Sequence, residues 1–452
     1  MTEVLVIGAG LAGLAAAVSA AESGARVTLC EKRSEIGGST VLSAGLSAFA
    51  GTEEQAAAGI ADSTELLRHD LLETGLHRND PALVDAYCAH QLDTYRWLRG
   101  LGVEYGKVHA ASGQSVPRSH PTDTRVLVRT LLERALSRGA VFLPDTRAHR
   151  LIVEDGAVRG VLTEEGERLR ADAVVLASGG FSRNPELLTR FAPQMERALR
   201  GGAAGSTGDG LLMAWKAGAG VIDTPYVKGT FGIHPDPDGA EGGTGVLAIY
   251  KGAIAVNRNG RRFVDESLPY KAVGDACLAQ PDGIAFQVFD AQVMDRADPS
   301  VPIYDFAARV GNGLLLRART LDELAGLIGV PADALRETVA AYNAAIAGRA
   351  PDEQGRTTLS GGVGTPVPIT TAPFYAHPST AVVLATYCGL TIDPSMRVLD
   401  VFGEVIDGLY AAGELVGGLH GAGYVTGTSI GKAAIFGRVA GLAASGAREE
   451  RP

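Results

Sequence analysis

The chain begins with short apolar runs separated by a glycine turn. Residues 4–7 are aliphatic and have the pattern of a buried parallel strand. The run breaks at Gly8, and an alanine-rich apolar segment over 14–23 predicts a helix. The next apolar run, 26–30, ends at Glu31. This order predicts a strand, a tight turn, a helix and a second strand, as at the start of a doubly wound α/β domain.

The turn carries the spacing G-x-G-x-x-G in Gly8, Gly10 and Gly13. Gly8 allows the tight turn, Gly10 lets the backbone approach a pyrophosphate, and Gly13 lets helix and strand pack closely. The helix N-terminus offers N–H groups and a positive dipole end to phosphates. Glu31 is placed to accept hydrogen bonds from an adenosine ribose. The alternative is an ordinary tight turn, but the flanking strand, helix and acid favour a dinucleotide-binding domain.

Later segments repeat the pattern of strand, glycine turn and helix, and a segment of different character interrupts them. Helical spacing predicts helices within 53–103 and over 124–139, and the turn Glu154-Asp155-Gly156 predicts a hairpin between strands 148–153 and 158–163. A strand over 173–177 runs into glycines, and Asp209 falls in the first turn of another predicted helix. Residues 225–365 hold short strands, Pro and Gly loops, and a helical stretch over 321–346 broken by Gly-Val-Pro. Residues 408–445 return to strand, glycines and helix.

Composition and charge narrow the class of protein. The 452 residues are 46% apolar and carry a net charge of −10 with no basic run, which argues against a nucleic-acid partner. The uncharged stretch 4–21 follows Thr2-Glu3 and is split by the glycine motif, so we expect neither a membrane span nor a signal peptide. Four scattered cysteines predict no disulfide, metal site or attached haem. We therefore expect a cytoplasmic protein without a transmembrane segment.

Three segments, near 8–45, 177–210 and 410–432, are predicted to touch one large dinucleotide. This favours FAD over NAD, because FAD is longer and no second G-x-G-x-x-G provides a nicotinamide domain. The predicted cofactor-binding residues are Gly8, Gly10, Ala12, Gly13, Glu31, Lys32, Gly38, Ser39, Thr40, Ser43, Ala44, Gly45, Ala148, Ala177, Ser178, Gly179, Thr207, Asp209, Gly413, Glu414, Ser429 and Ile430.

The sequence resembles the flavoprotein superfamily of fumarate reductase, succinate dehydrogenase and 3-ketosteroid dehydrogenases. The resemblance covers nearly the whole chain and rests on the FAD segments, on 253–266, on Tyr342-Asn343, on 373–376 and on the Ala-Ala-Gly-Glu segment 411–414. It implies an α/β fold: a Rossmann-like FAD-binding domain of the glutathione-reductase type with an inserted α+β substrate-capping domain. We expect the FAD domain at 1–224 and 366–452 and the cap at 225–365.

The resemblance also implies a reaction. Hydride passes between flavin N5 and one substrate carbon, and a proton passes at the neighbouring carbon, next to a carbonyl that stabilises charge. Fumarate reductases hold a dicarboxylate with two histidines and two arginines. Only His234 matches that set; Tyr270, Ala385 and Tyr424 stand at the other positions. Because a neutral phenol or a methyl group cannot replace a bidentate guanidinium, a plain fumarate reductase is disfavoured.

At the positions where the sequence departs from fumarate reductases, it resembles ketosteroid dehydrogenases. There a tyrosine hydroxyl and a glycine N–H polarise the ketone, which corresponds to Tyr424 and Gly427, and a second tyrosine removes the proton, which corresponds to Tyr270. A phenol with a pKa of about 10 needs its anion stabilised. Lys271 or Arg262 could do this, although Arg262 is more typical of a salt bridge holding the cap.

Three further residues complete the predicted catalytic set. His234 is a candidate substrate contact, Tyr387 is either a second aromatic group at the site or a core residue, and Arg118 is a candidate for holding a substrate carboxylate. No histidine lies near Ser39–Ala44 to carry covalent FAD, so the resemblance implies FAD held non-covalently.

We therefore predict an FAD-dependent dehydrogenase that introduces a C=C bond α,β to the carbonyl of a cyclic ketone. The substrate is a 3-ketosteroid or a smaller cyclic keto acid such as 4-oxocyclohexanecarboxylate. An external electron acceptor or donor is implied. Two alternatives stay open: a fumarate-reductase-like reductase of an unsaturated carboxylic acid, and a flavin-binding protein without turnover.

Overall fold

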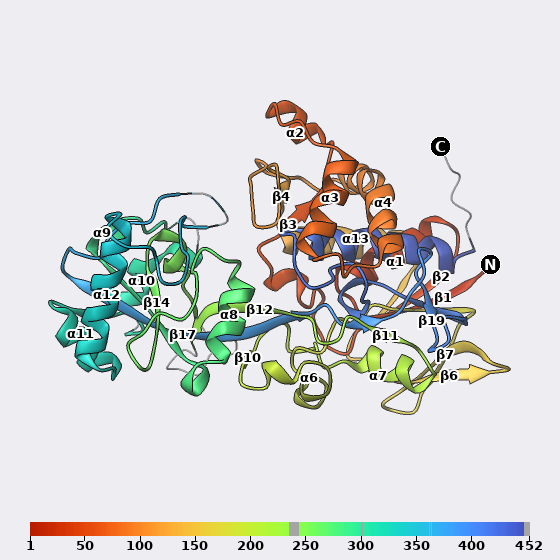
Figure 1. Ribbon diagram of the computed structural model, residues 1–452. Coiled ribbons are helices and arrows are strands. Elements are labelled where there is room, and N and C mark those ends of the chain that lie inside the picture. The colour runs from red at the N-terminus through yellow and green to blue at the C-terminus, as the bar shows by residue number, and fades with distance from the viewer. Residues whose placement is uncertain (235–243, 300–301, 312, 361, 363, 447–452) are drawn as a thin grey trace. The chain divides into compact units, whose positions relative to one another are not determined.

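The computed structural model describes residues 1–234, 244–299, 302–311, 313–360, 362 and 364–446. The chain forms two compact units, which are described separately (Figure 1). Unit 1 comprises Met1–Ala192, Gly202–Val227 and Ala385–Pro452. Unit 2 comprises Pro193–Gly201 and Lys228–Leu384.

Unit 1 is built on a mostly parallel sheet with the strand order β19-β20-β9-β1-β2-β5. Its strands are β1 (Glu3–Ile7), β2 (Arg26–Cys30), β5 (Val141–Leu143), β9 (Ala173–Leu176), β20 (Val405–Ala411) and the antiparallel edge strand β19 (Arg397–Leu399). Since parallel strands end at the same sheet edge, Gly8, Glu31, Ala177 and Ala412 all follow strands at that edge. The predicted doubly wound α/β fold is confirmed.

Two helices pack unusually closely beside this sheet: α1 (Leu11–Glu22) and α13 (Thr428–Ala444). A Cβ on Gly437 would lie 2.3 Å from the carbonyl oxygen of Ala12, and one on Gly441 would lie 2.2 Å from that of Ala16. Because only glycine fits at these two positions, one turn apart, the helices touch backbone to backbone. This contact fixes the start of α13 relative to the glycine turn before α1.

The other elements of unit 1 match the predicted pattern closely. Asp155 (φ 52°) and Gly156 (φ 79°) form the tight turn of the predicted hairpin, because an aspartate and a glycine tolerate a left-handed turn. The elements are α2 (Glu53–Ala57), α3 (Thr64–Thr74), α4 (Pro81–Gly100), α5 (Thr124–Ser137), α6 (Pro185–Phe191), α7 (Asp209–Lys216), β3 (Leu46–Ala48), β4 (Ser119–Pro121), β6 (Ala148–Glu154), β7 (Ala157–Thr163), β8 (Arg168–Arg170), β11 (Val221–Ile222) and β18 (Gly389–Leu390).

Unit 2 is built on a mixed sheet with the order β13-β12-β17-β15-β14, and β10 and β16 also pair with β17. The strands are β10 (Leu199–Arg200), β12 (Val227–His234), β13 (Thr244–Gly245), β14 (Ile254–Asn257), β15 (Ala285–Asp290), β16 (Leu316–Ala318) and β17 (Phe374–Thr386). The helices are α8 (Tyr270–Leu278), α9 (Ala291–Met294), α10 (Phe306–Gly311), α11 (Leu321–Ile328) and α12 (Ala332–Ile346).

Strand β15 is buried on both faces, and its side chains alternate between two cores. Ala285 and Phe289 join the core that includes residues of α8, whereas Phe286 and Val288 join the core that includes α11 and α12. The sheet is thus covered on both sides. The predicted break in the long helix is confirmed, since α11 ends at Ile328 and its C-cap residue Gly329 has φ 68°.

The second boundary between the units lies later than we predicted. We expected it at 365/366, but unit 2 continues to Leu384. The reason is that β17 is one continuous strand from Phe374 to Thr386, and the other strands of unit 2 pair along its first part. The pattern of residue types alone did not reveal to which sheet this strand belongs.

A buried ion cluster ties together unit 2. Arg262 pairs with Glu266 at 2.6 Å and with Asp352 at 2.6 Å, and its guanidinium lies over the ring of Tyr342. Arg356 donates hydrogen bonds to the carbonyl oxygens of two residues in the 249–253 segment. The interpretation of Arg262 as a salt-bridge residue is therefore confirmed, and its charge is neutralised by two carboxylates.

Candidate functional site

The glycine turn of unit 1 has the geometry that close approach requires. Gly8 has φ 107°, and a Cβ on Gly13 would lie 1.8 Å from the carbonyl oxygen of Gly8, so strand and helix meet without room for a side chain. A Cβ on Gly10 would meet only the carbonyl oxygen of Gly37, at 3.8 Å. The space beside Gly10 is therefore open, as a bound pyrophosphate would need.

The start of α1 is capped from another segment, because its N-cap residue, Gly10, has no side chain. The hydroxyl of Thr40 accepts the N–H of Leu11 at 3.2 Å. The adjacent Ser39 hydroxyl lies 3.3 Å from that of Ser206. These contacts hold the 38–45 loop beside both the helix start and the 203–208 segment.

Glu31 follows β2 directly, and its carboxylate accepts two backbone N–H groups. Ala9 donates to one oxygen at 2.8 Å and Arg33 donates to the other at 3.0 Å. The carboxylate is thereby fixed beside the glycine turn. Each oxygen keeps a lone pair for a ribose hydroxyl.

A charged network lies next to Glu31. Lys32 donates to the hydroxyl of Thr207 at 2.7 Å and to Asp209 at 3.0 Å, and Arg147 also donates to Asp209. Burial alone would raise the pKa of Asp209, but the hydrogen bonds and charges of Arg147 and Lys32 hold it below its usual value. A hollow of about 420 Å³ opens here, lined by Lys32, Arg33, Asp145, Arg147, Glu164, Glu165, Ala204, Gly205 and Thr207. A polar hollow beside the ribose acid fits the adenosine end of a dinucleotide.

The third predicted segment meets the second at Gly180. A Cβ on Gly180 would lie 2.2 Å from the hydroxyl oxygen of Thr386 and 2.3 Å from a carboxylate oxygen of Glu414. Glu414 also accepts the N–H of Thr386 at 3.0 Å, while the buried hydroxyl of Thr386 has no hydrogen-bond partner among the described residues. A buried polar atom without a partner is costly, so it fits a site completed by a bound polar group. The structure thus brings the predicted segments together within unit 1.

The remaining predicted cofactor residues lie along the same segments. Ser178 accepts the N–H of Gly210 at the start of α7. Gly413 has φ 76°, and a Cβ there would lie 2.7 Å from Cβ of Ala12. Ser429 and Ile430 are in the first turn of α13, whose N–H groups lack intrahelical partners. The others, placed on the 37–45 loop, on β6 and after β9, are Gly38, Ser43, Ala44, Gly45, Ala148, Ala177 and Gly179.

An aromatic cluster precedes α13. The ring of Tyr387 lies 5.0 Å from that of His420 and 6.1 Å from that of Tyr424, measured between centroids. Gly427, the N-cap of α13, has φ 94° and donates its N–H to the hydroxyl oxygen of Tyr424 at 3.3 Å. The two groups predicted to polarise a ketone are therefore hydrogen-bonded to each other, with the Gly427 N–H directed at the Tyr424 oxygen. Tyr387 is 1% exposed and stacks on Tyr424, so it supports that ring.

Arg118 is not placed to bind a substrate carboxylate. Its side chain is fully buried and pairs with Asp62 at 2.6 Å and with Asp70. Burial alone would lower its pKa, but these carboxylates raise it. Two buried acids already neutralise the guanidinium, so we withdraw Arg118 from the candidate substrate contacts. Neither acid was identified from the sequence, because both lie about 50 residues away.

Tyr270 and His234 belong to unit 2. Tyr270 is the first residue of α8, directly after Pro269, and packs partly buried against the core that includes Val273. Tyr270 thus lies at the positive end of the α8 dipole. Lys271 instead pairs with Asp275 at 2.7 Å. His234 is the last residue of β12. A second histidine, His377, is influenced by its charge: burial, together with the charges of His234 and Arg309, lowers the pKa of His377 to about 3.

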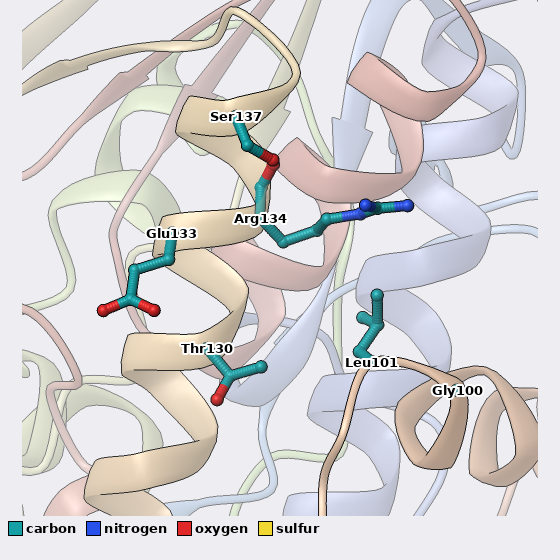
Figure 2. Close-up of a pocket in the computed structure, with 6 residues that line it drawn as sticks. All are labelled: Gly100, Leu101, Thr130, Glu133, Arg134 and Ser137. Carbon is teal, nitrogen blue, oxygen red and sulfur yellow. The ribbon is translucent and has the colours of Figure 1, made fainter.

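A second hollow, of about 400 Å³, lies between the end of α4 and α5 (Figure 2). Figure 2 shows Glu133 and Arg134 pointing in different directions, and Arg134 pairs with Glu22 at 2.5 Å. The residues that line this second hollow are Gly100, Leu101, Thr130, Glu133, Arg134 and Ser137. None of the predicted site residues lines it, so we assign it no catalytic role.

Comparison with known proteins identifies the family. A model described as "FAD binding domain" matches residues 3–430. The chain is 34% identical over 422 residues to "Fumarate reductase (cytochrome)" of Shewanella frigidimarina, covering 91% of this chain and 71% of that protein. A flavocytochrome c3 fumarate reductase in an open conformation aligns with a TM-score of 0.84 and 30% identity, covering 98% of this chain and 78% of that one. A 3-ketosteroid-Δ4-(5α)-dehydrogenase from Rhodococcus jostii RHA1 aligns with a TM-score of 0.79 and 26% identity, covering 98% and 97%.

The chain therefore belongs to the FAD-binding-domain family and is related to fumarate reductases. It is an FAD-dependent oxidoreductase of the class that acts on CH–CH and C=C groups. No helix in the described residues is long and apolar enough to span a bilayer. Those residues also contain no cluster of side chains suited to hold a metal ion.

Proposed function

We propose that this flavoenzyme is a dehydrogenase that forms a C=C bond α,β to the carbonyl of a cyclic ketone. The observation that carries the proposal is the contact between the Tyr424 hydroxyl and the Gly427 N–H, 3.3 Å apart. Two adjacent neutral donors suit a ketone oxygen that gains negative charge as the α-proton leaves, once that oxygen replaces the Tyr424 oxygen as acceptor of the Gly427 N–H. They do not suit a carboxylate, which guanidinium groups bind in pairs.

FAD supplies the acceptor for the hydride that leaves the β-carbon. Tyr424 and Gly427 hold the carbonyl oxygen, and Tyr270, as its phenolate, takes the proton from the α-carbon. Two C–H bonds break and one C=C bond forms. In this proposal the positive end of the α8 dipole stabilises the phenolate. Lys271 and Arg262 are not assigned this role, because both pair with carboxylates.

The proposed cofactor arrangement follows from the residues of unit 1. The glycine turn and Glu31 would hold the pyrophosphate and ribose, Lys32, Thr207 and Asp209 would border the adenosine end, and the start of α13 would lie at the flavin end. No side chain in the 38–45 loop is one that carries covalent FAD, so the cofactor is held non-covalently.

The second candidate is a reductase of an unsaturated carboxylic acid. Two observations favour it: His234 stands where fumarate reductases place a substrate histidine, and a 34% identical relative is a fumarate reductase. Against it, Ala385, Tyr270 and Tyr424 replace the other three dicarboxylate ligands.

The proposal is tested with the FAD-loaded enzyme and an artificial electron acceptor. Saturated cyclic ketones of different sizes, including a 3-ketosteroid and 4-oxocyclohexanecarboxylate, are supplied one at a time. A product two hydrogens lighter by mass spectrometry supports the proposal and identifies the substrate. Turnover only of fumarate or another unsaturated acid, with a reduced dye as donor, supports the reductase instead. Flavin that reacts with neither class supports a binding protein without turnover.

A further inference from the structure

Lys432 is a buried lysine that the proposed chemistry does not use. It lies in the second turn of α13 and its side chain is 2% exposed. Its ammonium nitrogen donates a hydrogen bond to the carbonyl oxygen of Val416 at 3.0 Å. Burying an ammonium group is costly unless nearby groups compensate its charge. A lysine kept at such a place therefore needs a functional reason.

The carboxylates that face Lys432 come from two other segments. Glu414 lies in the short 3₁₀ helix Gly413–Leu415, and Asp223 follows β11 and accepts the N–H of Gly418 at 2.7 Å. Burial lowers the pKa of Lys432 to about 8, against the opposing charges of Glu414 and Asp223. Burial raises the pKa of Asp223, and the charge of Asp80 adds to this.

The ammonium group links α13 to the 413–418 loop. Side chains on a helix lean toward its N-terminus, so Lys432 leans toward the first turn of α13, which contains Ser429 and Ile430. Its partner Val416 follows Glu414 by two residues. Lys432 thus stands between the two segments that we assign to the flavin end of the cofactor.

We propose that Lys432 is a positioning residue that holds the 413–418 loop and raises the reduction potential of bound FAD. A fixed positive charge in a buried site favours the electrons that reduction adds, because little water screens it. The inference rests on the proposed placement of FAD against Glu414 and α13, and it is independent of which substrate the enzyme uses.

The test is the reduction potential of the FAD-loaded protein, measured at pH 7 by equilibration with a reference dye and without substrate. In Lys432→Met, the equilibrium constant for reduction should fall at least about tenfold, which is about 30 mV for two electrons. Lys216→Met removes an exposed lysine charge from α7 of the same unit and should leave the potential unchanged. An unchanged potential in Lys432→Met overturns the proposal.

A second measurement needs no variant, so it stands even if Lys432→Met fails to retain FAD. Reduction should make Lys432 bind its proton more tightly. Above about pH 8 the wild-type potential should therefore fall more steeply with pH, by up to about 30 mV per pH unit for one extra proton per two electrons. A slope that stays constant through this range contradicts the proposal. A wild-type protein that binds no FAD would contradict the proposed placement of the cofactor, and with it this proposal. A wild-type protein that binds FAD but does not oxidise ketones would contradict only the proposed function.

Discussion

The hydroxyl oxygen of Tyr424 lies 3.3 Å from the amide nitrogen of Gly427, the N-cap residue directly before α13. Gly427 adopts φ 94°, and a Cβ there would lie 2.7 Å from the backbone nitrogen of Ala48. The position therefore requires glycine, and its N–H is aimed by the backbone alone. Tyr387 stacks on Tyr424 and fixes the other donor. A ketone oxygen that displaces the Tyr424 oxygen from the Gly427 N–H would accept from both groups.

Replacing Tyr424 with Phe should lower kcat about 10²- to 10³-fold on the ketone substrate, because one of two donors to the developing oxyanion is lost. FAD content should be unchanged. Tyr410→Phe makes the same chemical change on β20 and should keep kcat within about threefold, since Tyr410 lies in the sheet and has no role in the proposed reaction. Equal activity of Tyr424→Phe and wild type in steady-state kinetics would remove Tyr424 from the mechanism.

Tyr270→Phe should lower kcat by about 10²- to 10⁴-fold, because the proton on the α-carbon loses its base. The flavin spectrum should stay that of bound oxidised FAD. Tyr304→Phe is the matched control in unit 2, since the Tyr304 ring packs against the same core. The ammonium nitrogen of Lys251 lies over that ring, 4.3 Å from its centroid. The deuterium isotope effect at the α-carbon should grow in Tyr270→Phe. Near-normal turnover of that variant would show that another group takes the proton.

Arg118→Met should destabilise the protein by about 3–5 kcal/mol, because Asp62 and Asp70 would stay buried without their cation. The free energy of unfolding is measured by denaturant titration of the FAD-loaded protein. Arg168→Met, which breaks the exposed pair with Glu154, should change it by less than about 1 kcal/mol. If Arg118→Met were fully stable and had only a raised KM, Arg118 would return as a substrate contact.

Stability should depend on pH through Lys432. The pKa of Lys432 is lowered from 10.5 to about 8 in the folded protein, so between these values the unfolded chain binds the extra proton. The wild type should therefore gain stability relative to Lys432→Met as pH rises from about 8 to 10.5, by roughly 3 kcal/mol in total. Below pH 8 the difference between the two should be flat. Denaturation at several pH values that gave a constant difference throughout would mean that Lys432 titrates normally.

Features set by neighbouring residues were predictable from the sequence. The glycine turn, the Asp155-Gly156 hairpin and the helix break at Gly329 each depend on a few adjacent residues with special backbone freedom. The Arg262–Glu266 pair was also accessible, because the two residues are four apart.

Features set by distant contacts were not predictable. Arg118 looked available for substrate because Asp62 and Asp70 are remote in sequence and meet it only in the fold. Lys432 gave no signal, since a single lysine in an apolar helix is normally placed on the surface. The strand β17 was assigned to the wrong side of a boundary because its pairing, not its composition, decides its unit.

The central claim is most directly tested by the absorption spectrum of the oxidised enzyme under anaerobic conditions, as saturated cyclic compounds are added one at a time. The account predicts that a cyclic ketone bleaches the flavin band stoichiometrically, whereas its counterpart without the ketone, such as cyclohexanecarboxylate beside 4-oxocyclohexanecarboxylate, does not. If no ketone bleaches the band and an unsaturated acid reoxidises the reduced enzyme, the protein is a reductase and the account is wrong.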